Sequence, residues 1–538
     1  MKSTIVTIER RRKRQIIAVL LLSLATVGFG PFTSSAQDAG AISPASTAQP
    51  DMALIWNEHA ANAIFTVAGQ PPPRGIIHLA MAHLAIYDAV NAITGYRFSV
   101  YAVRPNIVFP ASPEAAAATA AHDVLVALFP NQQADLDAKY AESLATITDD
   151  TAKINGIAVG QQTAAGIIML RANDGRNAIV PYTPGSGPGV WQPTPPGFLP
   201  PATPEIAKVQ PLTLFSPTQF RAEPPPALNS ETWVRDYNEV KQLGGAVSSA
   251  RTPEHTDLAR FFIDQPALQW NRAWRGISIA RGLSLVDNAR FFAMLTTAGA
   301  DAVIACWDSK FFYNFWRPVT AIRAGDTDGS SETAPDPDWI GAVVTPNHPE
   351  YPSAHGCFSG ASIETLKYFF GADRSDFQMD SKVAGLTQPV RSYASFSQAL
   401  DDILNARVYG GMHYRNSTEK GALIGKQVSN FATQRFFRDR FMVCLQDDRS
   451  GDLLRFNWLT GEYTFTRCGT DGFTLTGVGV ISRVGCLLKL TDANVSAMFR
   501  QRPIGRSPSG AATIHVRPLG PTITLHDSDT SDNTCTCQ

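Results

Sequence analysis

The chain has 538 residues, more than one compact domain usually contains, so we expect two or more packed units. Its 46 lysine and arginine residues are balanced by 47 aspartate and glutamate residues, which gives a formal net charge of -1. This balance excludes the strongly basic surface typical of nucleic-acid binding and favours a small-molecule substrate.

The first 36 residues have the pattern of a signal peptide. The basic segment ERRRKRQ precedes the apolar segment IIAVLLLSLATVGFG, and small residues follow up to Ala36. The apolar segment, Ile16 to Gly30, is shorter than the roughly 20 residues that a membrane span needs. We therefore expect a signal peptide at residues 1–36, no membrane-spanning segment after its removal, and a secreted or periplasmic protein.

Residues 37–440 are predicted to form a mainly helical domain. In HLAMAHLAIYDAVNAI, His78 to Ile93, apolar residues recur every three or four positions. Ser112 followed by Pro113 is typical of a helix start. Residues 181–226 are rich in proline and form either a linker or an ordered wrap. We favour a wrap that docks its aromatic residues onto the helices, namely Trp191, Phe198, Phe215 and Phe220.

Residues 441–538 are predicted to form a separate small β-rich module, because short segments there alternate apolar and polar residues between turns. This module contains five of the seven cysteines: Cys444, Cys468, Cys486, Cys535 and Cys537. An oxidising compartment would allow disulfides among them, but their pairing cannot be read from the sequence. Cys306 and Cys357 stand apart, and we interpret them as small buried hydrophobic residues.

Two cations stand in an apolar setting in the segment KFFYNFWRP. Lys310 and Arg317 are seven residues apart, which predicts two helical turns and one helix face before Pro318 ends the helix. Burying such charges requires carboxylate partners or a bound anion. The alternative is a pair of surface cations lying over aromatic rings.

A third cation is directed inward by the segment SFSQALDDILNARVYGGMHYR. Ser397 is the expected N-cap of its helix. Arg407 shares an apolar stripe with Leu400, Ile403 and Leu404. His413 follows after a pair of glycines, whose flexibility would allow its imidazole to lie beside Arg407. A structural role for this histidine is the alternative.

The segment HPEYPSAHG, His348 to Gly356, offers hydroxyl and backbone donors near the start of an expected helix, which is typical of an anion site. Ser353 is not interpreted as a nucleophile, because no G-x-S-x-G surrounds it and triads assemble in space rather than along the chain. Lys310, Arg317, Ser353 and Arg407 would together suit phosphate or a similar oxyanion. Two histidines, His355 and His413, remain for chemistry.

Three motifs in order, KFFYNFWRP, PSAH and RVYGGMH, resemble the signature of the vanadium-dependent haloperoxidase and type 2 phosphatidic acid phosphatase superfamily. The resemblance implies a haloperoxidase-like helical bundle, with the β-rich module outside it. It also implies that the vanadate oxygens are bound by Lys310, Arg317, Ser353, the Ala354 backbone and Arg407. His413 would bind vanadium axially and His355 would be the acid/base. The motif has glycine at position 354, and alanine keeps the N–H group if its φ is negative.

The implied activity is a vanadium-dependent haloperoxidase that uses hydrogen peroxide to oxidise a halide, which then halogenates a small organic acceptor. Trp307 resembles a tryptophan of the fungal chloroperoxidases and His348 a histidine of the algal bromoperoxidases, so we expect bromide or iodide to be preferred. A turn-capping role for His348 is the alternative. Asp264 is a candidate for orienting an active-site arginine or histidine.

Phosphate would occupy the same site as vanadate, so a secreted acid phosphatase is the alternative function. In that reaction His413 would be the nucleophile that forms a phosphohistidine, and His355 would protonate the leaving group. A non-catalytic protein that displays its β-rich module for adhesion is a third hypothesis. It leaves three inward cations and two placed histidines without a role.

Overall fold

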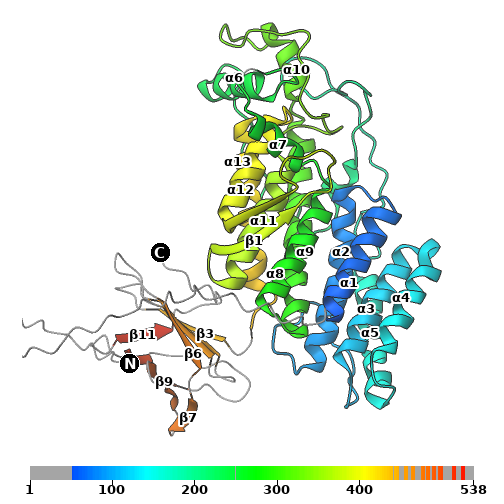
Figure 1. Cartoon of the computed structure of the whole chain (residues 1–538), viewed down its shortest axis with the longest axis vertical. Coiled ribbons are helices and arrows are strands. Elements are labelled where there is room, and N and C mark those ends of the chain that lie inside the picture. Colours follow the sequence, from blue (N-terminus) through cyan, green and yellow to red (C-terminus); the bar gives the residue numbers. More distant parts are fainter. Residues whose placement is uncertain are drawn as a thin grey trace, which may run out of the picture. The chain divides into compact units, whose positions relative to one another are not determined.

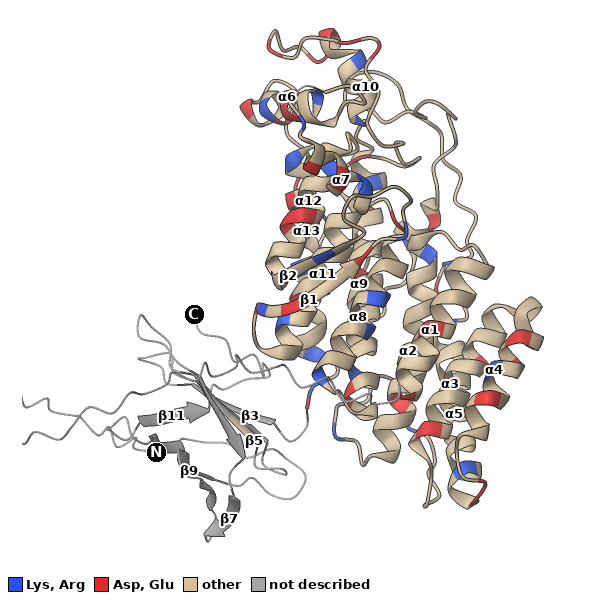
Figure 2. Cartoon of the chain, in the orientation of Figure 1, with Lys and Arg blue, Asp and Glu red and all other residues tan. Residues whose placement is uncertain are grey.

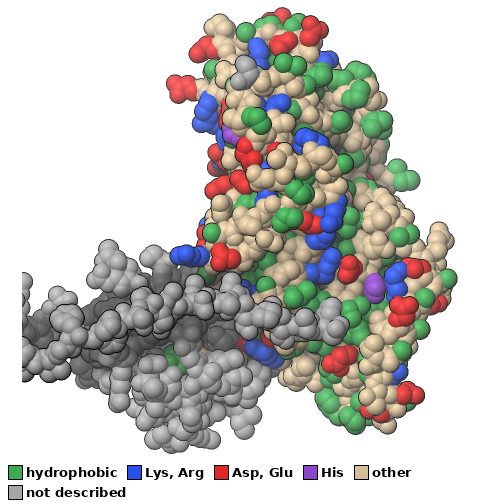
Figure 3. Space-filling view, viewed as in Figure 1, with side chains coloured by type: hydrophobic (Ala, Val, Ile, Leu, Met, Phe, Trp, Pro, Cys, Tyr) green, Lys and Arg blue, Asp and Glu red, His purple; other side chains and the backbone are tan. Residues whose placement is uncertain are grey.

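The computed structural model describes residues 51–248 and 250–439, together with the strands of a C-terminal sheet between Met442 and Asp527 (Figure 1). The predicted signal peptide at residues 1–36 lies outside the described residues. The region before residue 440 is mainly helical, as the sequence predicts. Acidic and basic residues are interspersed along this region (Figure 2), and both kinds of side chain lie on the face that Figure 3 shows.

The N-terminal half of the helical region is built on α2, and α1 and α3–α5 lie around it (Figure 1). The elements are α1 (Met52–Ala61), η1 (Asn62–Val67), α2 (Pro72–Ile93), α3 (Pro113–Leu128), η2 (Pro130–Gln132), α4 (Gln133–Ala145) and α5 (Thr151–Leu170). The predicted helix from His78 to Ile93 lies within α2. The Ser112 side chain accepts a hydrogen bond from the Ala115 N–H (3.1 Å), with Pro113 in the first turn of α3. This helix start is therefore the one that the sequence predicts.

The second half of the region is organised around the long helix α9. Its elements are η3 (Pro204–Lys208), α6 (Glu231–Gly244), α7 (Pro253–Phe261), α8 (Pro266–Arg281), α9 (Leu285–Tyr313), α10 (Pro318–Arg323), η4 (Gly325–Thr327), α11 (Ala354–Phe370), β1 (Arg374–Asp380), β2 (Val390–Ser395), α12 (Phe396–Tyr409) and α13 (Arg415–Arg435). Strands β1 and β2 form an antiparallel pair that the sequence did not predict. Helices α2 and α9 are long and apolar enough to span a membrane, but 94% of the apolar window of each is buried inside the protein. Burial of this extent is typical of core helices.

The proline-rich residues 181–226 run along the helices with little regular structure. Trp191 is fully buried, and Phe220 packs against the main core. Phe198 and Phe215 differ from the prediction, because their side chains are 64% and 83% exposed. The Phe215 ring nevertheless contacts Phe431 of α13, with ring centroids 5.3 Å apart, and backbone hydrogen bonds also fix this part of the segment. The buried carboxylate of Asp301 on α9 accepts N–H groups from residues 212 to 214.

Helices α11 and α13 approach each other closely because glycines face the partner backbone. A Cβ atom on Gly421 would lie 2.4 Å from the Ser353 carbonyl oxygen, and one on Gly425 would lie 2.3 Å from the Cys357 carbonyl oxygen. Any side chain at either position would therefore push the two helices apart. This packing fixes the start of α11, where Ser353 stands.

Cys306 on α9 and Cys357 on α11 form a disulfide, with their Cα atoms 6.3 Å apart. The prediction that they are only small buried hydrophobic residues is therefore wrong. Both are fully buried, as predicted, but the fold brings their side chains together. The sequence separation of 51 residues concealed this pairing. The bond joins the helix that contains Lys310 to the helix that starts beside Ser353.

The C-terminal region contains an antiparallel sheet with the strand order β6-β5-β4-β3-β11-β10-β9-β8-β7. Its strands are β3 (Met442–Gln446), β4 (Leu453–Asn457), β5 (Glu462–Thr466), β6 (Thr474–Val478), β7 (Val480–Val484), β8 (Leu487–Thr491), β9 (Val495–Arg500), β10 (Ala512–Val516) and β11 (Ile523–Asp527). The predicted β-rich character is thus present. The disulfides considered for this region fall outside the described residues.

Candidate active site

Lys310 and Arg317 do not share one helix face, so this prediction from their spacing is wrong. Helix α9 ends at Tyr313 because Asn314 adopts a left-handed backbone with φ 49°. Arg317 then lies in extended backbone as the residue that precedes α10. Both side chains nevertheless reach the interior, where each is fully buried. The alternative of surface cations is therefore excluded.

The two cations hold the loop that precedes α11. Lys310 Nζ donates to the carbonyl oxygens of Pro349 (3.0 Å) and Glu350 (2.9 Å). Arg317 Nε donates to the carbonyl oxygen of His348 (3.0 Å). Burial lowers the pKa of Lys310 well below its usual value, and the nearby Arg317 lowers it further. The backbone carbonyl groups of this loop accept hydrogen bonds from Lys310 and Arg317, but they carry no negative charge.

Arg407 is the third buried cation, with 2% of its surface exposed. Its Nη1 donates to the Phe262 carbonyl oxygen (3.0 Å), whereas its Nε has no hydrogen-bond partner. Its inward orientation agrees with the predicted stripe. The N-cap of α12 is Ser395 rather than Ser397, because the helix begins at Phe396 and the Ser395 side chain accepts the N–H of the first turn.

Glu350 is fully buried among these cations and was not assigned a role from the sequence. Its Oε1 atom lies 2.7 Å from His413 Nδ1 and accepts the Tyr414 N–H at 3.2 Å. Burial raises the pKa of Glu350 to about 7, against the opposing effect of Arg317 and Lys310. The sequence contains one indication of this role: Glu350 lies between two prolines, next to motifs whose three cations require a carboxylate.

The charges at this site do not balance. Lys310, Arg317 and Arg407 are all buried. In the described part of the chain, the carboxylate that contacts His413 is Glu350, and it faces Lys310 and Arg317. Burial lowers the pKa of Arg317 to about 10 and that of Arg407 to about 9. Burying a cation without a partner costs on the order of several kcal/mol, because the ion loses its hydration. The arrangement therefore fits a bound anion.

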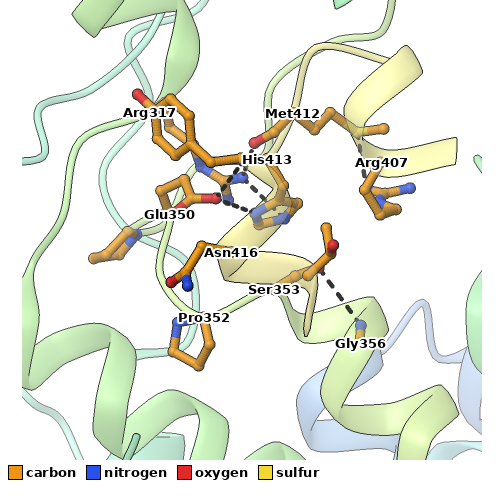
Figure 4. Close-up of polar contacts among 12 residues, drawn as sticks. Arg317, Glu350, Pro352, Ser353, Gly356, Arg407, Met412, His413 and Asn416 are labelled. Carbon is orange, nitrogen blue, oxygen red and sulfur yellow. Dashed lines mark hydrogen bonds and ion pairs between the residues drawn. The ribbon is translucent and has the colours of Figure 1, made fainter. Parts of the chain in front are cut away.

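His413 lies between Glu350 and Arg317, whose side chains converge on its ring (Figure 4). Because the carboxylate accepts a hydrogen bond at Nδ1, the neutral ring has its proton there and its lone pair on Nε2. Arg317 Nη1 lies 3.2 Å from Nε2 and can donate to that lone pair. Burial lowers the pKa of His413, and the nearby Arg317 and Lys310 lower it further. The ring therefore presents a neutral ligand nitrogen.

Ser353 is the N-cap of α11, and Figure 4 shows its contact with Gly356. Its hydroxyl oxygen accepts the Gly356 N–H at 3.5 Å, so the hydroxyl hydrogen remains available as a donor. Ala354 is the first residue of α11 and does not have a positive φ. Alanine therefore keeps the N–H group that the glycine of the motif would supply.

His355 lies at the pocket surface with one ring nitrogen free. The ring of His355 forms a hydrogen bond with the Phe262 backbone, whereas its Nε2 has no partner. Burial lowers the pKa of His355 well below its usual value, and Arg407 lowers it further. A neutral imidazole with an unpartnered nitrogen is suited to accept a proton.

Trp307 and His348 lie against each other, with ring centroids 5.1 Å apart. Trp307 Nε1 donates to Thr203 Oγ1 at 3.1 Å. Arg317 Nη2 lies 3.0 Å from His348 Nδ1, which accepts this hydrogen bond. His348 is therefore attached to the buried cations, and its ring is part of the site rather than only a loop cap.

Asp264 does not contact the predicted site residues and instead joins α8 to the segment after β1. Its Oδ2 atom accepts hydrogen bonds from Arg272 Nη2 (2.5 Å) and from the Lys382 N–H (3.0 Å). The predicted orienting role is therefore not found in its contacts. Asp264 lies just before α8, and its carboxylate contacts Arg272 of that helix.

A pocket of about 300 Å³ opens beside these residues. Its lining includes six of the predicted positions, namely Trp307, His348, Ala354, His355, Arg407 and His413. Among the described residues, no group of three His, Cys, Asp or Glu side chains is placed to hold a metal cation. The site offers N–H and O–H donors instead, which suit the oxygens of vanadate or phosphate.

A family model described as the VCPO second helical-bundle domain matches residues 290–440. This range includes Trp307, His413 and all the predicted vanadate-binding residues between them. The resemblance to the vanadium haloperoxidases is confirmed. The vanadium chloroperoxidase of Curvularia inaequalis is 27% identical over 184 residues, which cover 28% of this chain and 30% of that protein. The chain thus matches less than a third of this relative's length.

Solved structures of vanadium haloperoxidases have the same fold. The structure titled the first bacterial vanadium-dependent iodoperoxidase has a TM-score of 0.62 and 26% identity, and covers 70% of this chain and 94% of its own. An apo bacterial vanadium-dependent chloroperoxidase has a TM-score of 0.53 and 19% identity, and covers 66% and 91%. The mainly α, haloperoxidase-like fold is therefore confirmed. These relatives also support the prediction that the chain is an enzyme of the vanadium haloperoxidase class.

Proposed function

We propose that the chain is a vanadate-dependent haloperoxidase that oxidises halide with hydrogen peroxide. The observation that carries this proposal is the charge of the interior: three cations, Lys310, Arg317 and Arg407, are buried, and among the described residues Glu350 is the carboxylate that faces Lys310 and Arg317. An oxyanion supplies the missing countercharge and accepts hydrogen bonds from the donors that these side chains leave free. The match to the second helical bundle of vanadium chloroperoxidase supports vanadate as that oxyanion.

Vanadate would be held by donors from three segments of the chain. Its oxygens would accept hydrogen bonds from Lys310, Arg317, Ser353, the Ala354 N–H and Arg407, and His413 would bind vanadium through Nε2. The chemistry that vanadate supplies when bound is the activation of hydrogen peroxide toward attack by halide. Buried cations around the site strengthen this polarisation.

The contacts of His413 and His355 determine which ring nitrogen of each side chain can react. Glu350 holds the proton of His413 at Nδ1, which leaves the lone pair of the ring on Nε2, the nitrogen that Arg317 Nη1 contacts. His355 lines the pocket, and its Nε2 has no hydrogen-bond partner. Burial lowers the pKa of His355 and so keeps its ring neutral, which allows Nε2 to take a proton from hydrogen peroxide. The two histidines thus have different tasks because their partners differ.

Bromide or iodide is the proposed halide, and a small organic molecule is the proposed acceptor. The halide would lie near Trp307 and His348, whose rings are adjacent at the pocket wall. The similarity to a bacterial vanadium-dependent iodoperoxidase supports oxidation of the softer halides. The contact between His348 and Arg317 supports a role for His348 in this choice.

An acid phosphatase is the second candidate, because the same donors bind phosphate. His413, oriented by Glu350, has the unprotonated Nε2 that a phosphohistidine reaction requires. His355 would then protonate the leaving group. The matches to vanadium haloperoxidases favour the first proposal.

Export to the periplasm or the outside of the cell is also proposed. The N-terminal sequence pattern supports it, and so does the disulfide between Cys306 and Cys357, since structural disulfides persist in oxidising compartments.

A paired assay distinguishes the two activities. The purified chain is given orthovanadate, hydrogen peroxide and bromide or iodide with a phenolic acceptor, and separately a phosphate ester without vanadate. Vanadate-dependent halogenation is the expected result. Ester hydrolysis that vanadate inhibits would favour the phosphatase instead.

A further inference from the structure

The pocket has an apolar end that halide and hydrogen peroxide do not explain. Its wall there includes Pro72 and Ile76 of α2, Ala202, Ala267 of α8, Val303 of α9 and Phe358 of α11. The volume of about 300 Å³ compares with roughly 30 Å³ for one water molecule. It reaches the lower limit of pockets that hold organic ligands, about 300 Å³.

Two helices, α9 and α11, each contribute one residue to the apolar end of the pocket and another to its polar end, one helical turn away. On α9, Val303 precedes Trp307 by four residues, and on α11, Ala354 precedes Phe358 by four residues. Residues at this spacing share a helix face and are separated by about 6 Å along the axis. A flat ring system placed against Val303 and Phe358 would therefore have its other edge beside the polar end.

The charges of the lining indicate the kind of molecule that fits. Arg407 is the one lysine, arginine, aspartate or glutamate that lines the pocket, and it belongs to the polar end. A charged group at the apolar end would lose its hydration without gaining a partner. His355 lines the polar end, and its Nε2 has no hydrogen-bond partner. The occupant of the apolar end is thus neutral.

We propose that this apolar end binds a small neutral aromatic molecule and that the bound molecule is halogenated there. The inference rests on the proposed haloperoxidase function and names its acceptor class. The aromatic C–H bond breaks and a C–halogen bond forms, while the halide gives two electrons to the O–O bond of hydrogen peroxide. Two water molecules result, which take up the ring proton and one proton from the solvent.

The test uses the vanadate-loaded full chain with 2-naphthol as the neutral probe. A naphthol that bears a sulfonate group is the matched charged probe. Binding of each is followed by fluorescence, and both are then brominated in competition. The product ratio is compared with that of hypobromite reagent without protein. Iodide oxidation without an organic acceptor is measured in parallel.

The variant Ala202→Phe fills the apolar end from a half-buried coil position, and Val303→Ala enlarges that end with little risk to folding. Ala227→Phe, at an exposed coil position outside the pocket, is the control. We expect wild type to bind 2-naphthol saturably and to favour it over the sulfonate by about tenfold more than the reagent does, a typical difference for apolar pockets. Ala202→Phe should lose this preference and keep iodide oxidation within about twofold.

A wild-type product ratio equal to that of the reagent would overturn the proposal, because the electrophile would then react in solution. If Ala202→Phe does not fold, weaker naphthol binding in Val303→Ala supports the proposal and unchanged binding contradicts it. Absence of iodide oxidation in wild type would contradict the haloperoxidase function itself. Naphthol binding in that case would support the apolar binding site alone.

Discussion

His413 Nδ1 lies 2.7 Å from Glu350 Oε1 in the protein interior, where both side chains are almost fully buried. This contact fixes which nitrogen of His413 faces the oxyanion site. It also places the carboxylate where it offsets part of the charge of Lys310 and Arg317. Orientation and charge at the site therefore both depend on one residue of the segment HPEYPSAHG.

Replacing Glu350 with glutamine should destabilise the protein without vanadate or phosphate. The buried cations would lose the carboxylate beside them, and breaking a buried ion pair costs about 3–5 kcal/mol. Urea unfolding measures the effect. Glu223→Gln is the control, because Glu223 pairs with Lys420 at the surface, where solvent screens the pair, and its loss should leave stability nearly unchanged. Equal stability of Glu350→Gln and wild type would contradict this account of the interior charges.

Replacing His348 with phenylalanine should change the halide preference and leave vanadate binding largely intact. The variant keeps a ring beside Trp307 but loses the nitrogen that accepts a hydrogen bond from Arg317. The ratio of kcat/KM for bromide, iodide and chloride is the measurement, with vanadate affinity measured in the same samples. Unchanged halide ratios would return His348 to a structural role in its loop.

The double variant Cys306→Ala/Cys357→Ala should unfold at a lower denaturant concentration than wild type. A disulfide that closes a loop of this size typically contributes about 2–4 kcal/mol. Reducing the wild type should also lower its stability. Free thiols located at Cys306 and Cys357 by mass spectrometry of the unreduced wild-type protein would argue against this bond.

His122 should contribute more to stability in acid than in alkali. Burial lowers the pKa of His122, but hydrogen bonds to Asp123 and Asp137 outweigh burial and raise this pKa above 6.5. Because the folded pKa is the higher one, the contribution is fully present below about pH 6.5 and is lost as pH rises through the folded pKa. Urea unfolding of His122→Gln should therefore show a larger loss at about pH 5.5 than at about pH 8.5. A loss that does not vary with pH would contradict the ion-pair role.

The sequence predicted the identity of most site residues because their spacing in three motifs is informative. It could not predict the path between them: the left-handed Asn314 ends α9 and carries Arg317 into the interior from extended backbone. Glu350 was overlooked because a single glutamate carries no spacing signal. The Cys306–Cys357 bond depends on how α9 packs against α11, which local patterns do not encode.

The most direct test of the central claim is the equilibrium binding of orthovanadate by the full chain, measured by calorimetry in wild type and in Arg407→Met. Arg407 has a free Nε, and its guanidinium contacts the Phe262 carbonyl oxygen and Met412 rather than a carboxylate in the described part of the chain, so its loss should weaken binding by about tenfold or more. Arg260→Met is the control, since Arg260 donates to backbone carbonyls of residues 384 and 385. We predict one phosphate-competed site in wild type. Binding that Arg407→Met leaves unchanged, or no binding in wild type, would contradict the account.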